Sequence, residues 1–155
     1  MKKEMTEQDA LYKLTSLCAT GEYCQQDMLK KMARWEIADD AQARIMAHLV
    51  KEKYIDEERF CRAYVKSKLL YNKWGRRKIE QSLFQKRIPA EISTAVLDDL
   101  CGEMSAEILR PLLESKVKTI KANTDFERNG KLIRFALSRG FDMDLIIKTI
   151  KEILL

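Results

Sequence analysis

The fold is indicated by a stretch near the middle of the chain, Ile79-Glu-Gln-Ser-Leu-Phe-Gln-Lys-Arg-Ile88. A similar stretch lies 51 residues earlier, Met28-Leu-Lys-Lys-Met-Ala-Arg-Trp-Glu-Ile37, and another lies 53 residues later, Leu132-Ile-Arg-Phe-Ala-Leu-Ser-Arg-Gly-Phe141. After each copy, apolar residues return at helical spacing: Ala41, Met46 and Leu49; Ile92, Leu97 and Leu100; Leu145, Ile150 and Ile153. Recurrence at a nearly fixed interval predicts a tandem repeat.

Each copy predicts a short helix, a tight turn with an apolar residue, and a second helix. In the third copy Gly140 is a candidate C-cap and Asp142 an N-cap for the next helix. In the second copy Pro89 is predicted just inside the following helix. A further helix is predicted ahead of each pair, at roughly residues 7–19, 57–73 and 104–121. The sequence therefore predicts an all-α fold of three tandem three-helix repeats, residues 1–55, 56–102 and 103–155. Because so small a unit buries little apolar surface alone, the units are expected to stack into an elongated, curved solenoid.

Composition excludes several classes of protein. The chain has 155 residues, 46% of them apolar and 34% charged, with only five Gly and two Pro, which favours a folded helical protein. Its apolar runs are far shorter than the roughly 20 residues that a membrane span needs. The first ten residues contain no apolar core of a signal peptide. We therefore expect a cytoplasmic protein that does not enter the membrane, and a monomer.

Catalytic and metal chemistry have no support in the residue pattern. The four cysteines form no CxxC pair, and His48 is the only histidine, so no metal site is predicted. Reduced thiols, buried or half-buried, are expected instead. The chain has no Gly-rich phosphate loop and no histidine beside a nucleophile. We expect a protein that is not an enzyme and uses no cofactor.

Positive charge is concentrated in one segment. Residues 59–87 carry ten Lys/Arg and one acid, a net charge of +9. Residues 1–58 have nine basic and twelve acidic residues (−3), and residues 88–155 have ten and eleven (−1). A local field of this kind attracts a phosphate backbone or an acidic protein surface.

The helix that opens the middle unit is predicted to have two faces. Asp56 fits its N-cap, and Glu57 and Glu58 suit its first turn. An apolar side is expected to enter the core: Phe60, Ala63, Tyr64, Ser67, Leu70, Tyr71 and Trp74. A basic stripe lies beside it, and further cations follow Gly75, which together predict a partner-binding or DNA-binding set: Arg59, Arg62, Lys66, Lys73, Arg76, Arg77, Lys78, Lys86 and Arg87. The alternative is that these cations form only a solvated face and bind no partner. The turn at Gly75, which is flanked by four cations, is a second candidate for holding phosphate or acidic side chains.

Residues 54–68, Tyr-Ile-Asp-Glu-Glu-Arg-Phe-Cys-Arg-Ala-Tyr-Val-Lys-Ser-Lys, begin a longer pattern that continues through Gly75-Arg-Arg-Lys-Ile79 and Lys86-Arg-Ile88. This pattern resembles the signature of the RecX family, and Arg139-Gly-Phe141 resembles its C-terminal segment. The motif residues interpreted as structural are Tyr54, Asp56, Phe60, Tyr64, Gly75, Ile79, Gly140 and Phe141. Glu36, Lys53 and Arg87 stand where the family has Gly. These departures leave open whether left-handed helix caps are kept or the helix ends lengthen.

The resemblance implies three tandem three-helix repeats, no cofactor and no active site. It also implies binding to filaments of RecA recombinase and inhibition of their recombination, ATPase and coprotease activities in DNA repair and the SOS response. The main alternative is a helical protein that binds DNA directly, weakly and without sequence preference, since helix–turn–helix units with cations can enter DNA grooves.

Overall fold

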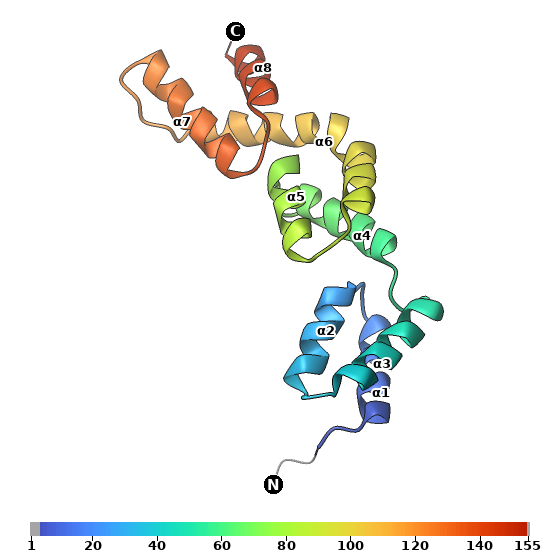
Figure 1. Ribbon diagram of the computed structural model, residues 1–155. Helices are drawn as coiled ribbons and strands as arrows, with labels where there is room; N and C mark the ends of the chain where they lie inside the picture. The colour runs from blue at the N-terminus through green and yellow to red at the C-terminus, as the bar shows by residue number, and fades with distance from the viewer. Residues whose placement is uncertain (1–3, 155) are drawn as a thin grey trace.

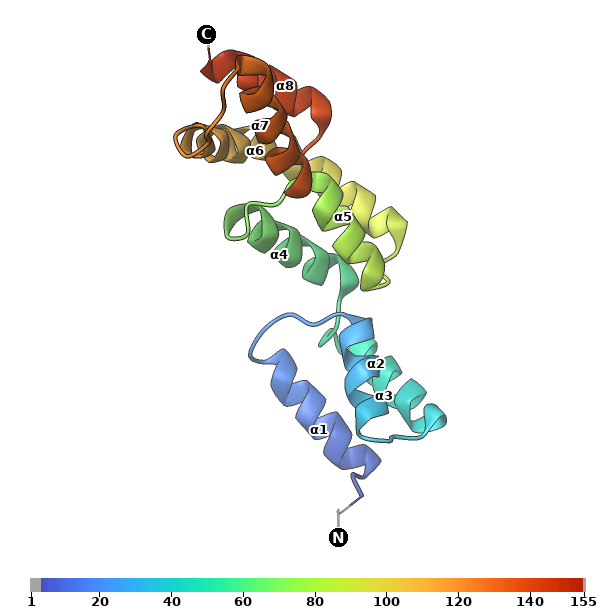
Figure 2. The same ribbon diagram turned by 90° about the vertical axis from the view of Figure 1, so that its left-hand side faces the viewer.

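The structure, a computed structural model, describes residues 4–154 and contains eight helices in that range (Figure 1). In chain order they are α1 (Glu7–Cys18), α2 (Gln25–Arg34), α3 (Asp39–Lys51), α4 (Glu57–Leu70), α5 (Arg76–Gln85), α6 (Ala90–Val117), α7 (Asp125–Ser138) and α8 (Met143–Ile153). Residues 4–154 contain no strand, which confirms the all-α prediction. Figures 1 and 2 show the units following one another along an elongated, curved molecule. No helix in this part of the chain has both the length and the apolar character to cross a bilayer.

One helix serves two units. The prediction of a separate helix at residues 104–121 is wrong, because α6 runs without a break from Ala90 to Val117. Two residues disfavoured in helix interiors, Gly102 and Pro111, lie inside α6 without ending it. Figure 1 shows α6 changing direction along its length, so that its first part packs beside α4 and α5 and its second part beside α7 and α8. The unit boundary expected between residues 102 and 103 therefore falls inside this helix.

The turn that follows the short helix has the same geometry in all three units. Glu36 and Arg87 have φ angles of 58°, and Gly140 has φ of 93°, so each is left-handed. The next residue donates its N–H to the carbonyl oxygen five positions back, Ile37 to Met32, Ile88 to Leu83 and Phe141 to Ala136, which is the hydrogen bond of the Schellman cap. Ile37, Ile88 and Phe141 are buried. The caps of the first two units are therefore kept without glycine, and Lys53 is also left-handed, with φ of 60°.

Two capping details differ from the sequence prediction. Pro89 is the N-cap of α6 and stands one residue before the helix, not inside it. Asp142 occupies the N-cap of α8, but its side chain caps no backbone N–H. The reason is that Oδ1 of Asp142 pairs with Nε of Arg77 at 2.8 Å.

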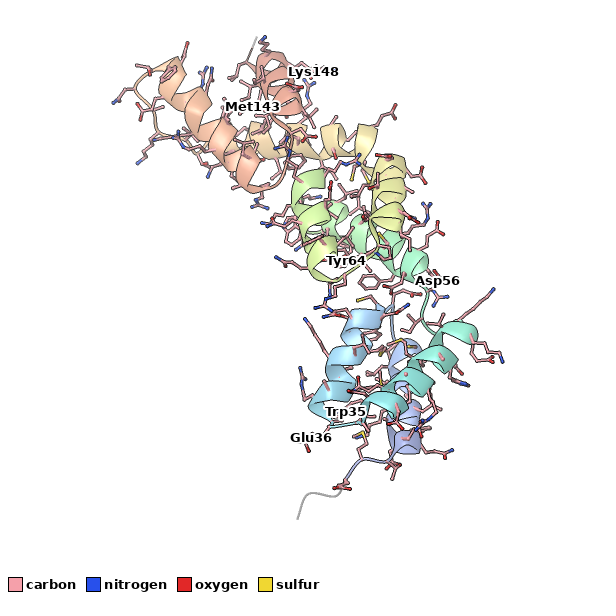
Figure 3. All side chains as sticks on the ribbon, viewed as in Figure 1. Trp35, Glu36, Asp56, Tyr64, Met143 and Lys148 are labelled. Carbon is pink, nitrogen blue, oxygen red and sulfur yellow. The ribbon has the colours of Figure 1, made fainter. Side chains whose placement is uncertain are left out.

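Replacing the left-handed residue of the first unit should stabilise the protein. For Glu36→Gly we expect the free energy of unfolding to rise by about 0.5–1 kcal/mol, because the left-handed conformation costs an L-residue roughly 1–2 kcal/mol and unfolded-chain entropy returns only part of it. Glu36 is exposed at the turn between α2 and α3 (Figure 3), so no packing contact is lost. Urea denaturation measures the change. Glu36→Ala is the control, because it keeps the strained Cβ; an equal gain from alanine would contradict the explanation.

The molecule has two separate hydrophobic cores. The first lies within α1–α3 and includes Met28, Met32 and Leu49, all fully buried. The second is shared by α4–α8. Polar contacts dominate the junction between them: Nε of Arg59 with Oε1 of Glu22 (2.6 Å), Nζ of Lys86 with Oδ1 of Asp27 (3.2 Å), and N–H of Gln25 donating to Oε1 of Glu57 (2.9 Å). Among the described residues of the first unit, 4–55, Cys24 is the one buried residue that packs into the second core.

Backbone atoms are in close contact where α5 meets the turn between α7 and α8, at the junction of the second and third units. The N–H of Gly75 donates to the carbonyl oxygen of Arg139 at 2.7 Å, and the N–H of Arg77 donates to that of Gly140 at 3.0 Å. A Cβ on Gly75 would lie 2.5 Å from backbone atoms of Gly140 and Phe141. A Cβ on Gly140 would lie 2.4 Å from the Cβ of Lys78. The two motif glycines are thus required by the close approach of α5 to the turn between α7 and α8.

Candidate functional site

The basic segment begins on α4, whose start follows the predicted rules. Oδ1 of Asp56 accepts the N–H of Arg59 at 3.0 Å, and Glu57 and Glu58 lie in the first turn. Figure 3 places Asp56 at the connection between the first unit and α4. The helix ends at Leu70, earlier than the predicted residue 73. Lys73 follows in the left-handed conformation, with φ of 57°, so it lies in a turn and does not extend the helical stripe.

The predicted core face of α4 is partly wrong. Phe60 is buried and Tyr64 is half-buried, but Ala63, Leu70 and Tyr71 are exposed, with Tyr71 82% exposed. The helix instead buries Cys61, Val65 and Leu69. The reason is that α6 packs along that stripe, whereas the apolar periodicity of α4 fits either of two adjoining stripes. Tyr64 reaches α5, where its hydroxyl hydrogen-bonds with that of Ser82.

Five of the nine predicted binding cations are paired with carboxylates. Nη2 of Arg62 lies 2.9 Å from Oδ2 of Asp99, and Nη2 of Arg76 lies 2.7 Å from Oδ1 of Asp98. The pairs of Arg59, Arg77 and Lys86 are those already described at the unit junctions and at Asp142. These carboxylates come from outside residues 59–87. The folded surface around this segment is therefore less positive than the segment's own net charge of +9. The paired cations join α4 and α5 to neighbouring helices and connecting segments.

The other four predicted cations have no carboxylate within 4 Å among residues 4–154: Lys66, Lys73, Lys78 and Arg87. Lys66, Lys73 and Arg87 are exposed. The ammonium of Lys78 lies 4.6 Å from the ring centroid of Trp74, and that of Lys68 lies 4.9 Å from it. The Trp74 ring therefore holds two cations in place and is not available for stacking on a partner. These four side chains can bind an anion without first breaking an internal ion pair.

The backbone N–H groups of Gly75 and Arg77 are not free to bind phosphate at this turn. The N–H groups of Gly75 and Arg77 already donate to carbonyl oxygens of the third unit. Gly75 is also buried. Its role in the structure is to allow contact between units.

The other motif residues are placed as a structural role requires. Ile79 and Phe141 are buried in the second core, and Gly140 caps α7. Tyr54, 40% exposed, stacks beside His48 with ring centroids 6.3 Å apart. Cys24, Cys61 and Cys101 are buried free thiols, and Cys18 is half-buried, as predicted. Burial raises the pKa of Cys24 and of Cys61 to about 11, so both thiols stay protonated at neutral pH.

Comparison with known proteins agrees with the repeat. Residues 56–97 match the model of the RecX second three-helix domain, and residues 103–150 match that of the third. The chain is 30% identical over 126 residues to the regulatory protein RecX of Chlorobium limicola, covering 81% of this chain and 75% of that one. It is 30% identical over 142 residues to the regulatory protein RecX of Acinetobacter baylyi, covering 89% and 84%.

A solved structure shows the same fold. The crystal structure of a regulatory protein RecX superposes with a TM-score of 0.85 at 18% identity, covering 94% of this chain and 73% of that one. The matched domain models cover more than half of the chain, and the relatives extend the match into the first unit. On these grounds the chain belongs to the RecX family.

Proposed function

We propose that the protein binds filaments of RecA recombinase and inhibits their recombination, ATPase and coprotease activities. The relatives are named regulatory proteins, and membership of their family supports a regulatory role. The observation that carries the proposal is the set of cations without carboxylate partners on an elongated, curved surface, because a recombinase–DNA filament is long, helical and rich in phosphate. The protein acts by binding and performs no catalysis.

Within the predicted binding set, we assign partner contact to the cations that have no carboxylate partner in the described part of the chain. Lys66, Lys73 and Arg87 are exposed, and Lys78 is half-buried against Trp74. The paired residues, for example Arg62 and Arg76, would first have to give up Asp99 and Asp98. Complementary charge mainly speeds and orients association, so the free cations are expected to govern the salt dependence of filament binding.

The test is a recombinase ATPase assay on single-stranded DNA. For the triple variant Lys66→Glu, Lys73→Glu and Arg87→Glu we expect inhibitory potency to fall about tenfold or more, because three favourable charge contacts become repulsive. The matched control reverses three exposed lysines elsewhere, Lys30, Lys148 and Lys151, which have no carboxylate within 4 Å among residues 4–154 (Lys148 lies on α8 in Figure 3). Both variants change net charge equally. Full inhibition by the folded test variant would refute the site assignment.

A further inference from the structure

A second group of cations lies in the third unit, outside the basic segment 59–87. A shallow hollow forms where α6 ends and α7 passes beside it. Its lining includes the apolar side chains of Ile120 and Phe135 and four cations, Lys116, Lys121, Lys131 and Arg134. No carboxylate is part of this lining. The charged side chains that line the hollow are therefore all positive.

Contacts within the third unit hold these cations together. Nζ of Lys131 donates to the carbonyl oxygen of Lys121 at 2.6 Å. Nζ of Lys116 lies 4.9 Å from the ring centroid of Phe135, and the guanidinium of Arg139 lies 5.3 Å from the same centroid. Among the four lining cations, only Lys131 has a carboxylate within 4 Å in the described part of the chain, Glu127 at 3.5 Å. Lys121 and Arg134 are exposed and free of such a partner.

The positive charge around the hollow does not appear in the net charge of residues 88–155 taken as one segment. Residues 110–139 contain eight Lys/Arg against three acids, a net charge of +5: Arg110, Lys116, Lys118, Lys121, Arg128, Lys131, Arg134 and Arg139 against Glu114, Asp125 and Glu127. Residues 88–109 contain five acids and no base, and residues 140–155 contain three acids and two bases. Acidic flanks therefore cancel the excess in the sum of −1 over residues 88–155, although the folded hollow remains positive.

We propose that this hollow binds the phosphate groups of a DNA strand, without sequence preference. Lysine-rich, one-signed surfaces suit phosphate, which compact ammonium groups bind as point charges. A protein partner is less well matched, because protein interfaces have apolar centres in which lysine is depleted. The ring of Phe135 is flanked by Lys116 and Arg139, so recognition is through phosphates and not through stacking on bases.

The inference deepens the proposed function by giving the third unit a contact with the DNA of the filament. Its test does not need the recombinase, because the site should bind DNA weakly when no recombinase is present. The second unit then contacts the filament through Lys66, Lys73 and Arg87, and the third unit contacts nucleic acid through Lys121 and Arg134. The two assignments can fail separately.

The experiment measures fluorescence anisotropy of a labelled oligothymidylate titrated with the full chain at several salt concentrations. The test variant is Lys121→Glu with Arg134→Glu, and the control is Lys148→Glu with Lys151→Glu, two exposed lysines on α8. For the test variant we expect DNA affinity to fall about tenfold or more and the salt slope of log K to shrink by about 1.4, because about 0.7 is lost per phosphate contact on single strands. The control should bind within about twofold of the native chain, because its charges lie outside the hollow.

Each other outcome overturns the inference. Equal losses in the test and control variants would show that net charge alone attracts DNA. Absence of DNA binding by the native chain, with recombinase inhibition intact, would remove the DNA site and leave the proposed function standing. Loss of inhibition in Lys121→Glu with Arg134→Glu, with DNA affinity retained, would show that the hollow contacts the recombinase. Circular dichroism confirms that both variants are folded.

Discussion

Gly75→Ala is expected to lower the free energy of unfolding of the second core by about 3 kcal/mol, near the upper end of what overpacking costs. The added methyl group would lie 2.5 Å from the carbonyl carbon and oxygen of Gly140 and from the nitrogen of Phe141. These are backbone atoms, which cannot turn aside as a flexible side chain would. The junction between α5 and the turn after α7 must therefore separate, which weakens the hydrogen bonds of Gly75 and Arg77 to the third unit.

Gly102→Ala is the matched control for this prediction. A Cβ at Gly102, inside α6, would meet no atom within 4 Å. Alanine there should stabilise the protein by about 0.5–1 kcal/mol, because glycine is a poor residue inside a helix. Thermal and urea denaturation measure both variants. Equal effects of the two substitutions would contradict the close-contact explanation of Gly75.

The repeat could be predicted because its signals are local in sequence. Met28, Ile79 and Leu132 occupy equivalent positions, and all three are fully buried. The apolar residue after each turn is buried as well, because the Schellman hydrogen bonds draw it under the helix end. Helical periodicity and capping act over a few residues, so a single chain displays them directly.

The candidate surface was harder to predict because ion pairs join distant parts of the chain. Arg62 is neutralised by Asp99, and Arg77 by Asp142, 65 residues away. A sum of charges along residues 59–87 contains neither acid. The same summation concealed the cationic hollow at Lys121 and Arg134. Only the packing of α6 against α4 and of α8 near α5 decides which cations remain free.

The left-handed caps show a second limit. Glu36, Lys53 and Arg87 have the positive φ that favours glycine, although no glycine signals it. A buried isoleucine comes one or two residues after each of them, and its burial requires the turn. These isoleucines are Ile37, Ile55 and Ile88. Burial of an isoleucine outweighs roughly 1–2 kcal/mol of backbone strain, because full burial of such a side chain is itself worth about 1.5–3 kcal/mol. Tertiary packing here overrides local conformational preference.

The separation into two cores predicts that the first unit unfolds without the others. α1–α3 form one small core, and their junction with α4 and α5 is mainly polar, with Cys24 as the single buried side chain that crosses it within residues 4–154. Ion pairs between exposed or partly exposed side chains, such as Arg59 with Glu22, contribute little to stability. A unit of this size has little stability in reserve. By contrast, α6 and the shared core couple the second and third units into one cooperative block.

Met32→Ala should therefore unfold the first unit and leave the rest of the molecule intact. Met32 is fully buried in the core of α1–α3, and truncation of a buried methionine costs about 2–5 kcal/mol, comparable to the whole stability expected of so small a unit. Hydrogen exchange followed by mass spectrometry should show lost protection in peptides from α1–α3 and native protection in α7 and α8. Leu97→Ala, in the second core, is the counterpart and should expose α4–α8 first. Loss of protection in α8 together with α1 in the Met32 variant would mean that all three units unfold as one, and the polar junction would then be as strong as the shared core.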